Sequence, residues 1–449
     1  MTDRRPPAPD GLPVLGNAVA FVRDPFGFIA AAVAEHGDVF RLSLPGEDKY
    51  VLAHPEYLER ALVTEPDAFA KTDDFRLAFG ESVLAVEGEA WREQRELLDP
   101  FFFFRRIRSY APQMRAQATR RVESWTPGET YSMVEEMKGL TFDVLGSTLL
   151  GRDPTGDGGS DAELRAAADN LNARFSPESW ALPEWVPTRN RRRFDDAVST
   201  LRAEVRRLLR EANANTGTNA DSDADAEEPD LLSVLAGARE GDGYPRTDAA
   251  VSDQLVGMVF AGHETTALAL TFVWYLLARN PDARARLHEE VDAVVGDDPV
   301  EMSQLADLTY TERVFEEALR LYPPIHTLPR ETTREVAAGD YRIPAGSEVL
   351  LSVVNVHRDG RFYDDPAAFD PDRWTDERAA ARPDYAYAPF GAGPRRCMGR
   401  AFATVEAKLV IAEVTRRYRL EWAGDGDLSV RPQMTTQPVG GVPMRVEER

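Results

Sequence analysis

The feature that most constrains this sequence is its single cysteine, Cys397, among 449 residues. Cys397 lies in a loop rich in glycine and arginine, residues 389–400, and a helix-like run, residues 401–407, follows at once. Unpaired backbone N–H groups and the helix dipole favour an anion at a helix N-terminus, and Arg395 and Arg396 add positive charge. The loop therefore suits a thiolate, which could form one axial bond to a flat cofactor such as haem. A buried structural cysteine is the alternative interpretation.

The charge balance argues against nucleic acid as a partner. The chain has 53 basic and 76 acidic residues, a net charge of −23 and a pI near 4.8, so its surface repels polyanions. Only four residues are lysine, and an acidic, lysine-poor surface predicts a halophilic source. The N-terminal residues are polar and the apolar runs are short or interrupted, so we expect neither a signal peptide nor a membrane anchor. One cysteine fits a cytoplasmic protein.

Hydrophobic patterning predicts a mainly α-helical chain with a smaller β part. Two hairpins are expected, from residues 39–44 with 49–52 and from residues 341–346 with 348–354, and residues 428–446 are expected to form strands and turns. The acidic stretch 215–230 predicts a flexible loop within a single domain spanning 1–449, because helical patterns continue on both sides. Helices are predicted over residues 90–98, 112–125, 131–150, 161–173, 191–213, 229–238, 247–278, 281–295 and 310–321.

The cysteine loop follows the pattern Phe-x-x-Gly-x-Arg-x-Cys-x-Gly from Phe390 to Gly399. This pattern resembles the haem-binding signature of the cytochrome P450 family. The resemblance implies haem b with Cys397 as the thiolate ligand to the iron, and Phe390 packed beside the sulfur. It also implies that Gly393 and Gly399 allow close backbone approach and that Arg395 pairs with a haem propionate. The implied fold is that of the family, with a long central helix over a haem held by the cysteine loop.

Glu317 and Arg320 lie three residues apart in a predicted helix and can form a salt bridge on one face. Together with Arg373 they resemble the family's buried Glu-Arg-Arg triad. The resemblance implies a structural role for the three residues behind the haem.

Residues 261–266 interrupt the longest predicted helix with the motif Ala-Gly-His-Glu-Thr-Thr. His263 and Glu264 do not begin a zinc-protease motif, because the second histidine is missing four residues later. The segment resembles the family's dioxygen-activating sequence. By that resemblance Ala261 and Gly262 leave room for O2, Thr265 hydrogen-bonds the oxygens, and Glu264 relays protons through water.

Trp91 and Arg95 lie four residues apart and share a helix face, so both can point at one anionic group. In the family this pair contacts the haem propionates, and Arg330 matches another propionate-binding arginine. The resemblance implies that Arg95, Arg330 and Arg395 balance two propionate charges.

The segments that face the substrate in the family are mostly apolar here, which predicts a hydrophobic substrate. The sequence resembles fatty-acid-hydroxylating members, but the turn that carries a carboxylate-binding arginine in some of them reads Glu-Asp-Lys at residues 47–49. A lipid, a fatty-acid-like molecule and a terpenoid therefore remain open. The candidate substrate residues are Phe75, Leu77, Phe79, Val83, Leu84, Phe260, Ile325, Leu328 and Met434.

The sequence thus predicts a haem-thiolate monooxygenase that inserts one oxygen atom of O2 into a hydrophobic small molecule. We expect a separate ferredoxin and ferredoxin reductase to supply the electrons. A peroxide-driven peroxygenase and a non-catalytic haem or lipid-binding sensor on the same fold are the alternatives, and the Glu264–Thr265 pair counts against both. The basic residues expected to form a docking patch are Arg95, Arg105, Arg106, Arg108 and Arg396.

Overall fold

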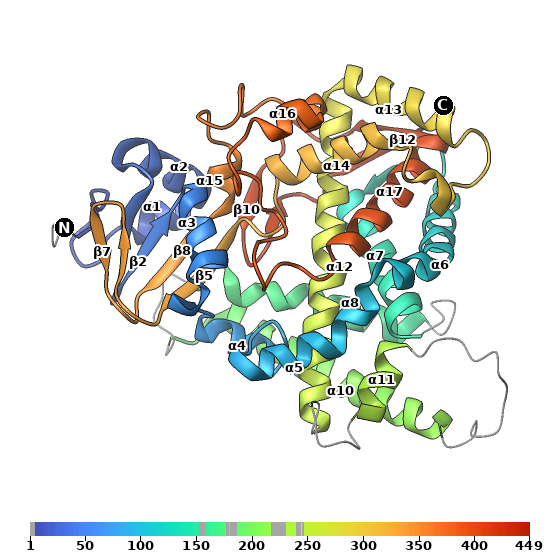
Figure 1. The fold of residues 1–449 in the computed structure, drawn as a ribbon. Helices are drawn as coiled ribbons and strands as arrows, with labels where there is room; N and C mark the ends of the chain where they lie inside the picture. The colour runs from blue at the N-terminus through green and yellow to red at the C-terminus, as the bar shows by residue number, and fades with distance from the viewer. Residues whose placement is uncertain are drawn as a thin grey trace.

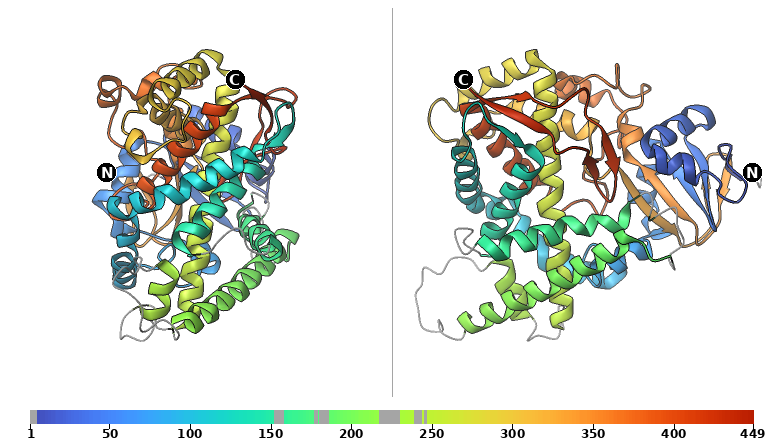
Figure 2. Two further views of the ribbon diagram at one scale, coloured as in Figure 1. Left: turned by 90° about the vertical axis from the view of Figure 1, so that its right-hand side faces the viewer. Right: turned by 180° about the vertical axis from the view of Figure 1, so that it is seen from behind.

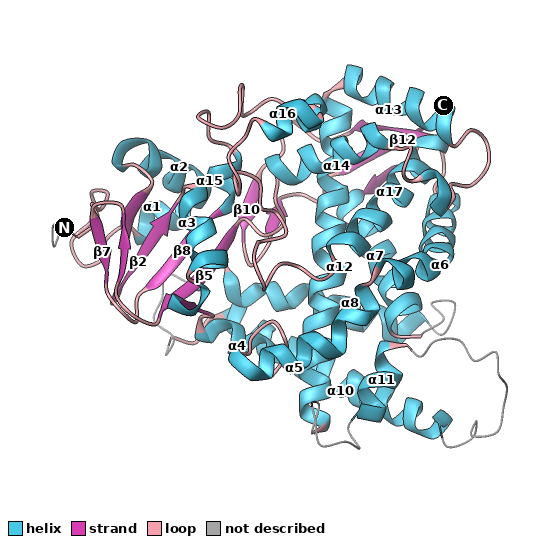
Figure 3. Cartoon of the chain, viewed as in Figure 1, coloured by secondary structure: helices cyan, strands magenta, loops and turns pink. Residues whose placement is uncertain are grey.

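The protein consists of a large helical body and a smaller strand-rich region that contains the N-terminus (Figure 1; Figure 3). The computed structural model describes residues 5–151, 158–176, 179, 186–216, 230–238, 244 and 247–449. Most of the acidic stretch predicted as a flexible loop, residues 217–229, lies outside these ranges.

All nine predicted helices between residues 90 and 321 are present. The largest difference between predicted and observed bounds is at the start of α6. This helix begins at residue 104 instead of 112 and carries Pro112 in its interior, on the exposed side. The helices are α5 (Gly88–Leu98), α6 (Phe104–Glu123), α7 (Met133–Leu149), α8 (Gly158–Asn170), α10 (Arg189–Thr216), α11 (Leu231–Ala238), α12 (Asp248–Arg279), α13 (Pro281–Val294) and α14 (Thr309–Leu321).

Helix α12 runs through the middle of the helical body (Figure 1). The Thr247 side chain caps its N-terminus by accepting a hydrogen bond from the backbone N–H of Ala250. It packs against α7, α10, α14 and the helix that follows the cysteine loop, α17 (Arg400–Arg417). By length and composition α12 could cross a membrane, but 83% of its most apolar 18-residue window is buried inside the protein, as in the core helix of a globular domain.

The strand-rich region is built on a five-stranded sheet with the order β1-β2-β8-β5-β3. The first predicted hairpin is confirmed, as β1 (Val39–Leu44) pairs antiparallel with β2 (Glu47–Leu52). Short helices lie against this region, namely α1 (Ala18–Arg23), α2 (Pro25–His36), α3 (Pro55–Glu59) and α15 (Val353–His357) (Figure 1). The remaining strands of the sheet are β3 (Phe69–Ala70), β5 (Thr327–Thr332) and β8 (Glu348–Ser352).

The second predicted hairpin is wrong. Strand β7 (Tyr341–Ile343) pairs with β6 (Val336–Ala338), through a tight turn at Gly339, whose φ of +56° favours glycine. Strand β8 instead lies inside the main sheet, parallel to β2 and antiparallel to β5. Its last four residues are all buried, so it needs neighbours that a two-stranded hairpin could not provide.

The predicted C-terminal strands are present and lie against the helical body (Figure 2). Strands β4 (Thr130–Ser132), β12 (Pro443–Glu448) and β9 (Tyr418–Trp422) form one sheet. Strands β10 (Val430–Pro432) and β11 (Thr436–Pro438) form a separate antiparallel hairpin. Two further helices are α4 (Asp73–Phe79) and α16 (Asp376–Ala380).

Candidate active site

The cysteine loop is closed by backbone hydrogen bonds. The Cys397 N–H donates to the Phe390 carbonyl at 2.9 Å, and the Arg396 N–H donates to the Gly393 carbonyl at 3.2 Å. Gly393 has a φ of +67°, and a Cβ atom there would lie 2.0 Å from the Leu62 carbonyl oxygen. Glycine at 393 is therefore required by the close approach of the loop to another part of the backbone, in addition to any contact with a cofactor.

Cys397 lies directly before the N-terminus of α17, as the sequence predicted. Burial raises the pKa of the Cys397 thiol, whereas hydrogen bonds from the backbone of Gly399 and Arg400 and the charge of Arg95 lower it. The side chain remains accessible to a small molecule, and a Cβ on Gly399 would lie 3.8 Å from the sulfur. The sulfur is thus surrounded by groups that favour its anion while one side stays open.

Helix α5 lies beside the cysteine loop and presents Trp91 and Arg95 to it. The Arg395 guanidinium lies 4.8 Å from the centre of the Trp91 ring, and Arg95 Nη1 donates to the Arg396 carbonyl at 2.9 Å. Arg95 also pairs with Asp99 at 2.5 Å. The structure therefore brings together three of the predicted propionate-binding residues.

Positive charge is concentrated and incompletely paired around Arg330. Arg330 is 5% exposed, and its one side-chain hydrogen bond to a described residue goes to the Pro329 carbonyl. Burial and the charge of Arg395 lower the pKa of Arg330 to about 10, and burial, Arg330 and Arg395 hold the pKa of Lys71 well below its usual range. Within this cluster, Glu87 is the anion that pairs with Arg395. A buried cation without a counter-ion is costly, so the cluster fits an anionic ligand such as the two propionates of haem.

One face of α12 is open where the rest of the helix is closed. From residue 250 to residue 277 every side chain is buried except those of Ala261, Gly262 and Thr265. Positions 261, 262 and 265 share a helix face, and the Thr265 hydroxyl donates to the Ala261 carbonyl at 2.7 Å. A Cβ on Gly262 would lie 2.9 Å from Leu145, so this glycine also lets α7 approach α12 closely. The open face fits a flat group lying against the middle of the helix.

Glu264, next to Thr265, points into a buried polar cluster and is 2% exposed. Its Oε1 pairs with Lys138 at 3.3 Å and accepts a hydrogen bond from Gln437 at 3.0 Å. Its Oε2 accepts hydrogen bonds from Asn172 and from Thr435, the latter at 3.2 Å. Four donors from different parts of the chain therefore fix this carboxylate.

The cluster continues toward solvent through Asp169. Lys138 also pairs with Asp169 at 2.7 Å, and the Asp169 side chain is 33% exposed. His263 is 1% exposed and lies 3.5 Å from the same carboxylate. Burial alone would raise the pKa of Asp169, but the neighbouring His263 ring and the charge and hydrogen bond of Lys138 lower it overall.

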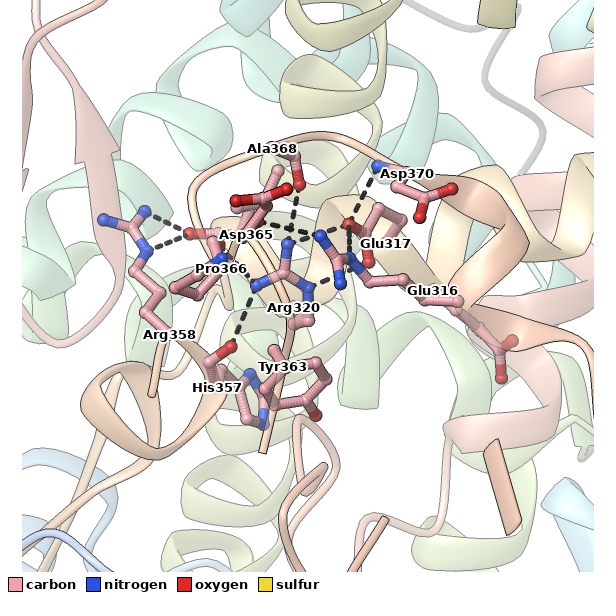
Figure 4. A network of polar contacts seen from close by, with 12 residues as sticks. Glu316, Glu317, Arg320, His357, Arg358, Tyr363, Asp365, Pro366, Ala368 and Asp370 are labelled. Carbon is pink, nitrogen blue, oxygen red and sulfur yellow. Dashed lines mark hydrogen bonds and ion pairs between the residues drawn. The ribbon is translucent and has the colours of Figure 1, made fainter. Parts of the chain in front are cut away.

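The triad implied by the family resemblance assembles in the core, and Figure 4 shows Glu317 beside Arg320. Glu317 is fully buried and accepts two hydrogen bonds from Arg320, at 2.8 and 2.9 Å, and one from Arg373 at 3.2 Å. Trp374 and the backbone N–H of Asp370 donate to the same carboxylate at 3.0 Å. The remaining N–H groups of Arg320 donate to the carbonyls of His357, Pro366 and Ala368.

His357 connects the triad to the cysteine loop. Its carbonyl accepts from Arg320, and its ring Nε2 accepts from the backbone N–H of Ala388 at 2.9 Å, two residues before Phe390. Burial lowers the pKa of His357 to about 3, so the ring is neutral and can accept this hydrogen bond. The triad therefore supports the loop that carries Cys397.

The aromatic candidates for substrate contact lie together. The ring centres of Phe79 and Phe260 are 5.1 Å apart, and Phe75 lies 6.1 Å from Phe79 and 6.4 Å from Phe175. Leu77 is 52% exposed on the solvent side of α4 and does not belong to this cluster. The other candidates, Val83, Leu84, Ile325, Leu328 and Met434, are buried or half-buried.

Sequence reasoning missed several residues of the site. Lys71 and Glu87 belong to the cation cluster, and Phe175 extends the aromatic cluster. The donors to Glu264 were also missed, because they come from three segments of the chain that lie far from Glu264 in the sequence. Those donors are Lys138, Asn172, Thr435 and Gln437.

The chain is similar to known proteins along nearly its whole length. The family model of cytochrome P450 matches residues 6–441. Cyclooctatin synthase of Streptomyces melanosporofaciens is 33% identical over 97% of this chain and 95% of its own, and pentalenene oxygenase of Streptomyces avermitilis is 32% identical over 95% and 93%. Cyclooctat-9-en-7-ol 5-monooxygenase of Streptomyces melanosporofaciens is 33% identical over 92% of this chain and 89% of its own. The structure of retinoic acid-bound cyanobacterial CYP120A1 covers the full chain with a TM-score of 0.85 at 24% identity. The chain therefore belongs to the cytochrome P450 family and is a haem b-dependent monooxygenase.

Proposed function

We propose that this enzyme inserts one oxygen atom of O2 into a hydrophobic, terpenoid-type substrate. The observation that carries the proposal is the open face of α12, where Ala261, Gly262 and Thr265 interrupt an otherwise buried helix. The names of two relatives specify oxidation of pentalenene and of cyclooctat-9-en-7-ol, which favours a terpenoid over a fatty acid.

The cysteine loop and the cation cluster would hold the haem. Cys397 Sγ would bind the iron, with Phe390 beside it, and Gly393 and Gly399 would keep the loop backbone close. Trp91, Arg95, Arg330 and Arg395 would surround the propionates, and Lys71 adds a further cation to this group. When bound, haem supplies the electron-transfer chemistry and oxygen activation that side chains lack.

The residues of α12 would leave room for O2 and deliver protons. Ala261 and Gly262 leave room beside the helix, and the Thr265 hydroxyl, which bonds to the Ala261 carbonyl, would supply a hydrogen-bond donor toward that space. Glu264 would hold the carboxyl proton at Oε1 or Oε2 and pass it on through water.

An apolar wall would bind the substrate. Phe75, Phe79 and Phe260 pack together, and Leu84 lies against Gly257 of α12, where an added Cβ would be 3.4 Å from the Leu84 side chain. Burial of the hydrocarbon against these side chains would supply most of the binding energy. The other proposed contacts are Ile325, Leu328 and Met434.

A spectroscopic and turnover experiment tests the proposal. The reduced, carbon monoxide-treated protein should show the red-shifted Soret band of a haem thiolate, and Cys397→Ser should lose it. A panel of cyclic terpenes and fatty acids should then shift the haem spin state, with terpenes binding more tightly. Hydroxylated product should require O2 and an electron donor. Product from hydrogen peroxide alone would indicate a peroxygenase, and no product at all would indicate a sensor.

We propose that the electron donor is a ferredoxin, reduced by its reductase, that docks beside the cysteine loop. Residues 100–122 and 385–405 carry nine arginines and no aspartate or glutamate, in a chain of net charge −23. Phe103 and Phe104 are 60% and 61% exposed there, and the adjacent Phe102 packs on Phe402 of α17 at 6.3 Å. The predicted patch residues Arg95, Arg105, Arg106, Arg108 and Arg396 fall in or beside these segments, which suits an acidic partner.

The docking proposal is tested with a bacterial ferredoxin. The rate of haem reduction by ferredoxin should fall as ionic strength rises. At one fixed ionic strength, the rate should be lower for Arg108→Glu than for the unaltered protein. Arg279→Glu is the matched control, because Arg279 is an exposed arginine at the far end of α12. Equal effects of the two changes would contradict the proposed surface.

We also propose that the chain is one cytoplasmic domain that works at high salt. The family model extends over residues 6–441, and the acidic surface is typical of proteins from saline cytoplasm. Thermal unfolding of the purified protein should shift upward in molar potassium chloride, and an unchanged midpoint would contradict the halophilic part.

A further inference from the structure

Glu264, Thr435 and Gln437 form a closed ring of hydrogen bonds. Gln437 Nε2 donates one hydrogen to Glu264 Oε1 at 3.0 Å and the other to Thr435 Oγ1 at 2.6 Å. The Thr435 hydroxyl donates to Glu264 Oε2 at 3.2 Å. The Thr435 hydroxyl also lies 3.5 Å from Asn172 Oδ1, and Thr435 is fully buried, so water does not replace this hydroxyl in the ring.

The ring attaches Glu264 to the β10–β11 hairpin, whose tip carries Met434. Among the described strands, β10 and β11 pair only with each other, so the hairpin is independent of the larger sheets. Its other side is held by the Thr436 hydroxyl, which donates to the Pro323 carbonyl at 2.7 Å, and by a 2.9 Å hydrogen bond between His326 Nε2 and the Gln433 carbonyl. Met434 thus lies between an anchored side and the side that contacts Glu264.

The four contacts of Glu264 differ in charge. Lys138 forms an ion pair with it, whereas Asn172, Thr435 and Gln437 are neutral donors. All four hold the carboxylate in one orientation, in which it accepts hydrogen bonds and donates none. To hand a proton toward Thr265, the carboxyl group must leave at least part of this arrangement, and the neutral hairpin bonds are weaker than the ion pair.

We propose that Thr435 and Gln437 are positioning residues for Glu264, which couple the orientation of its carboxyl group to the hairpin that contacts the substrate through Met434. The inference rests on the proposed function, because it needs Glu264 to relay protons and Met434 to face the substrate. Substrate seated against Met434 moves the hairpin, and the hairpin releases or reorients the carboxyl group. Proton delivery is thereby linked to the presence of substrate.

The first experiment compares two adjacent buried threonines in the haem-loaded enzyme. Thr435→Val removes a donor to Glu264, and Thr436→Val removes a hydroxyl of the same hairpin that bonds to Pro323 instead. We expect Thr435→Val and Gln437→Leu to lower product formed per electron consumed by about threefold to tenfold, with the lost electrons appearing as hydrogen peroxide. Thr436→Val should retain the original ratio. Equal losses in both threonine variants would overturn the inference.

The second experiment tests the link itself without turnover. Hydrogen exchange of residues 430–438 should be faster in Glu264→Gln than in the unaltered protein, and added substrate should no longer change it. The effects of Thr435→Val and Glu264→Gln on coupling should be non-additive, because both break one contact. Unchanged exchange, or additive effects, would overturn the inference. The carbon monoxide spectrum is recorded for every variant. A lost haem-thiolate band would mean that the haem site itself has failed. A retained band together with a negative result would mean that only the inference about the hairpin is wrong.

Discussion

Two buried glutamates on two helices of this protein have similar exposure and contrasting surroundings. Glu317 is held by two guanidinium groups, an indole and a backbone N–H. The remaining N–H groups of Arg320 are bound to carbonyls (Figure 4). Glu264 is held by one ammonium group and three neutral side chains from other segments. Glu317 is therefore fixed mainly by two cations. Three of the four donors of Glu264 are neutral, so losing one of them would not leave a buried cation without a counter-ion. Burial alone does not separate a structural acid from a catalytic one.

The largest expected effect is at Glu317. Replacing Arg320 with leucine should destabilise the protein by about 3–5 kcal/mol, because it leaves the Glu317 carboxylate buried with one remaining arginine. Unfolding in urea, followed by far-ultraviolet circular dichroism, measures the loss. Arg286→Leu is the control, since its bidentate pair with Asp372 is exposed and should contribute less than about 1 kcal/mol. Similar losses for both variants would contradict the assigned role of the triad.

A smaller loss of stability is expected at Glu264. Glu264→Gln should cost about 1–3 kcal/mol, because the amide keeps an acceptor for the hairpin and Lys138 keeps its 2.7 Å pair with Asp169. The same urea titration measures it, and the coupling of electrons to product should fall far more than the stability does. A destabilisation as large as that of Arg320→Leu would remove the contrast between the two sites.

A third buried glutamate sharpens the comparison. Glu406 of α17 is 1% exposed, its Oε1 has no hydrogen-bond partner among the described residues, and burial raises its pKa well above the ordinary value. The folded protein then holds this proton more tightly than the unfolded chain, so stability falls as pH rises, by up to about 1.4 kcal/mol per unit until the folded form ionises.

Glu406→Gln should remove this contribution, and unfolding free energies between pH 5 and 8 measure it. The unfolding free energy of Glu406→Gln should increase relative to that of the unaltered protein as pH rises. Glu413, fully buried on the same helix but paired with Arg416 at 2.6 Å, is the control, and Glu413→Gln should be less stable throughout. Parallel pH curves for Glu406→Gln and the unaltered protein would show that Glu406 has an undetected partner.

Local patterns predicted the parts of this enzyme that lie within a few residues of one another. The spacing of Glu317 and Arg320 placed both on one helix face, and the glycine pattern around Cys397 identified the loop. The pairing of β7 was wrong because strand patterns do not specify the neighbour, and Leu77 was assigned inward although its side of α4 faces solvent. Thr435 and Gln437 could not be recognised, since contact with Glu264 depends on a fold that brings residues more than 170 positions apart together.

The arginines around the cysteine loop also give the molecule an electric dipole. Residues 100–122 and 385–405 carry nine arginines, of which Arg115, Arg121 and Arg395 pair with acids of other segments, and the rest of the chain carries more than the whole net negative charge. Near a cathode, such a molecule turns its arginine-rich end toward the surface even though the chain as a whole is repelled. The enzyme should therefore orient itself on a negatively charged carbon electrode with the thiolate side toward the electrode. It should then accept electrons directly from the electrode without any protein partner.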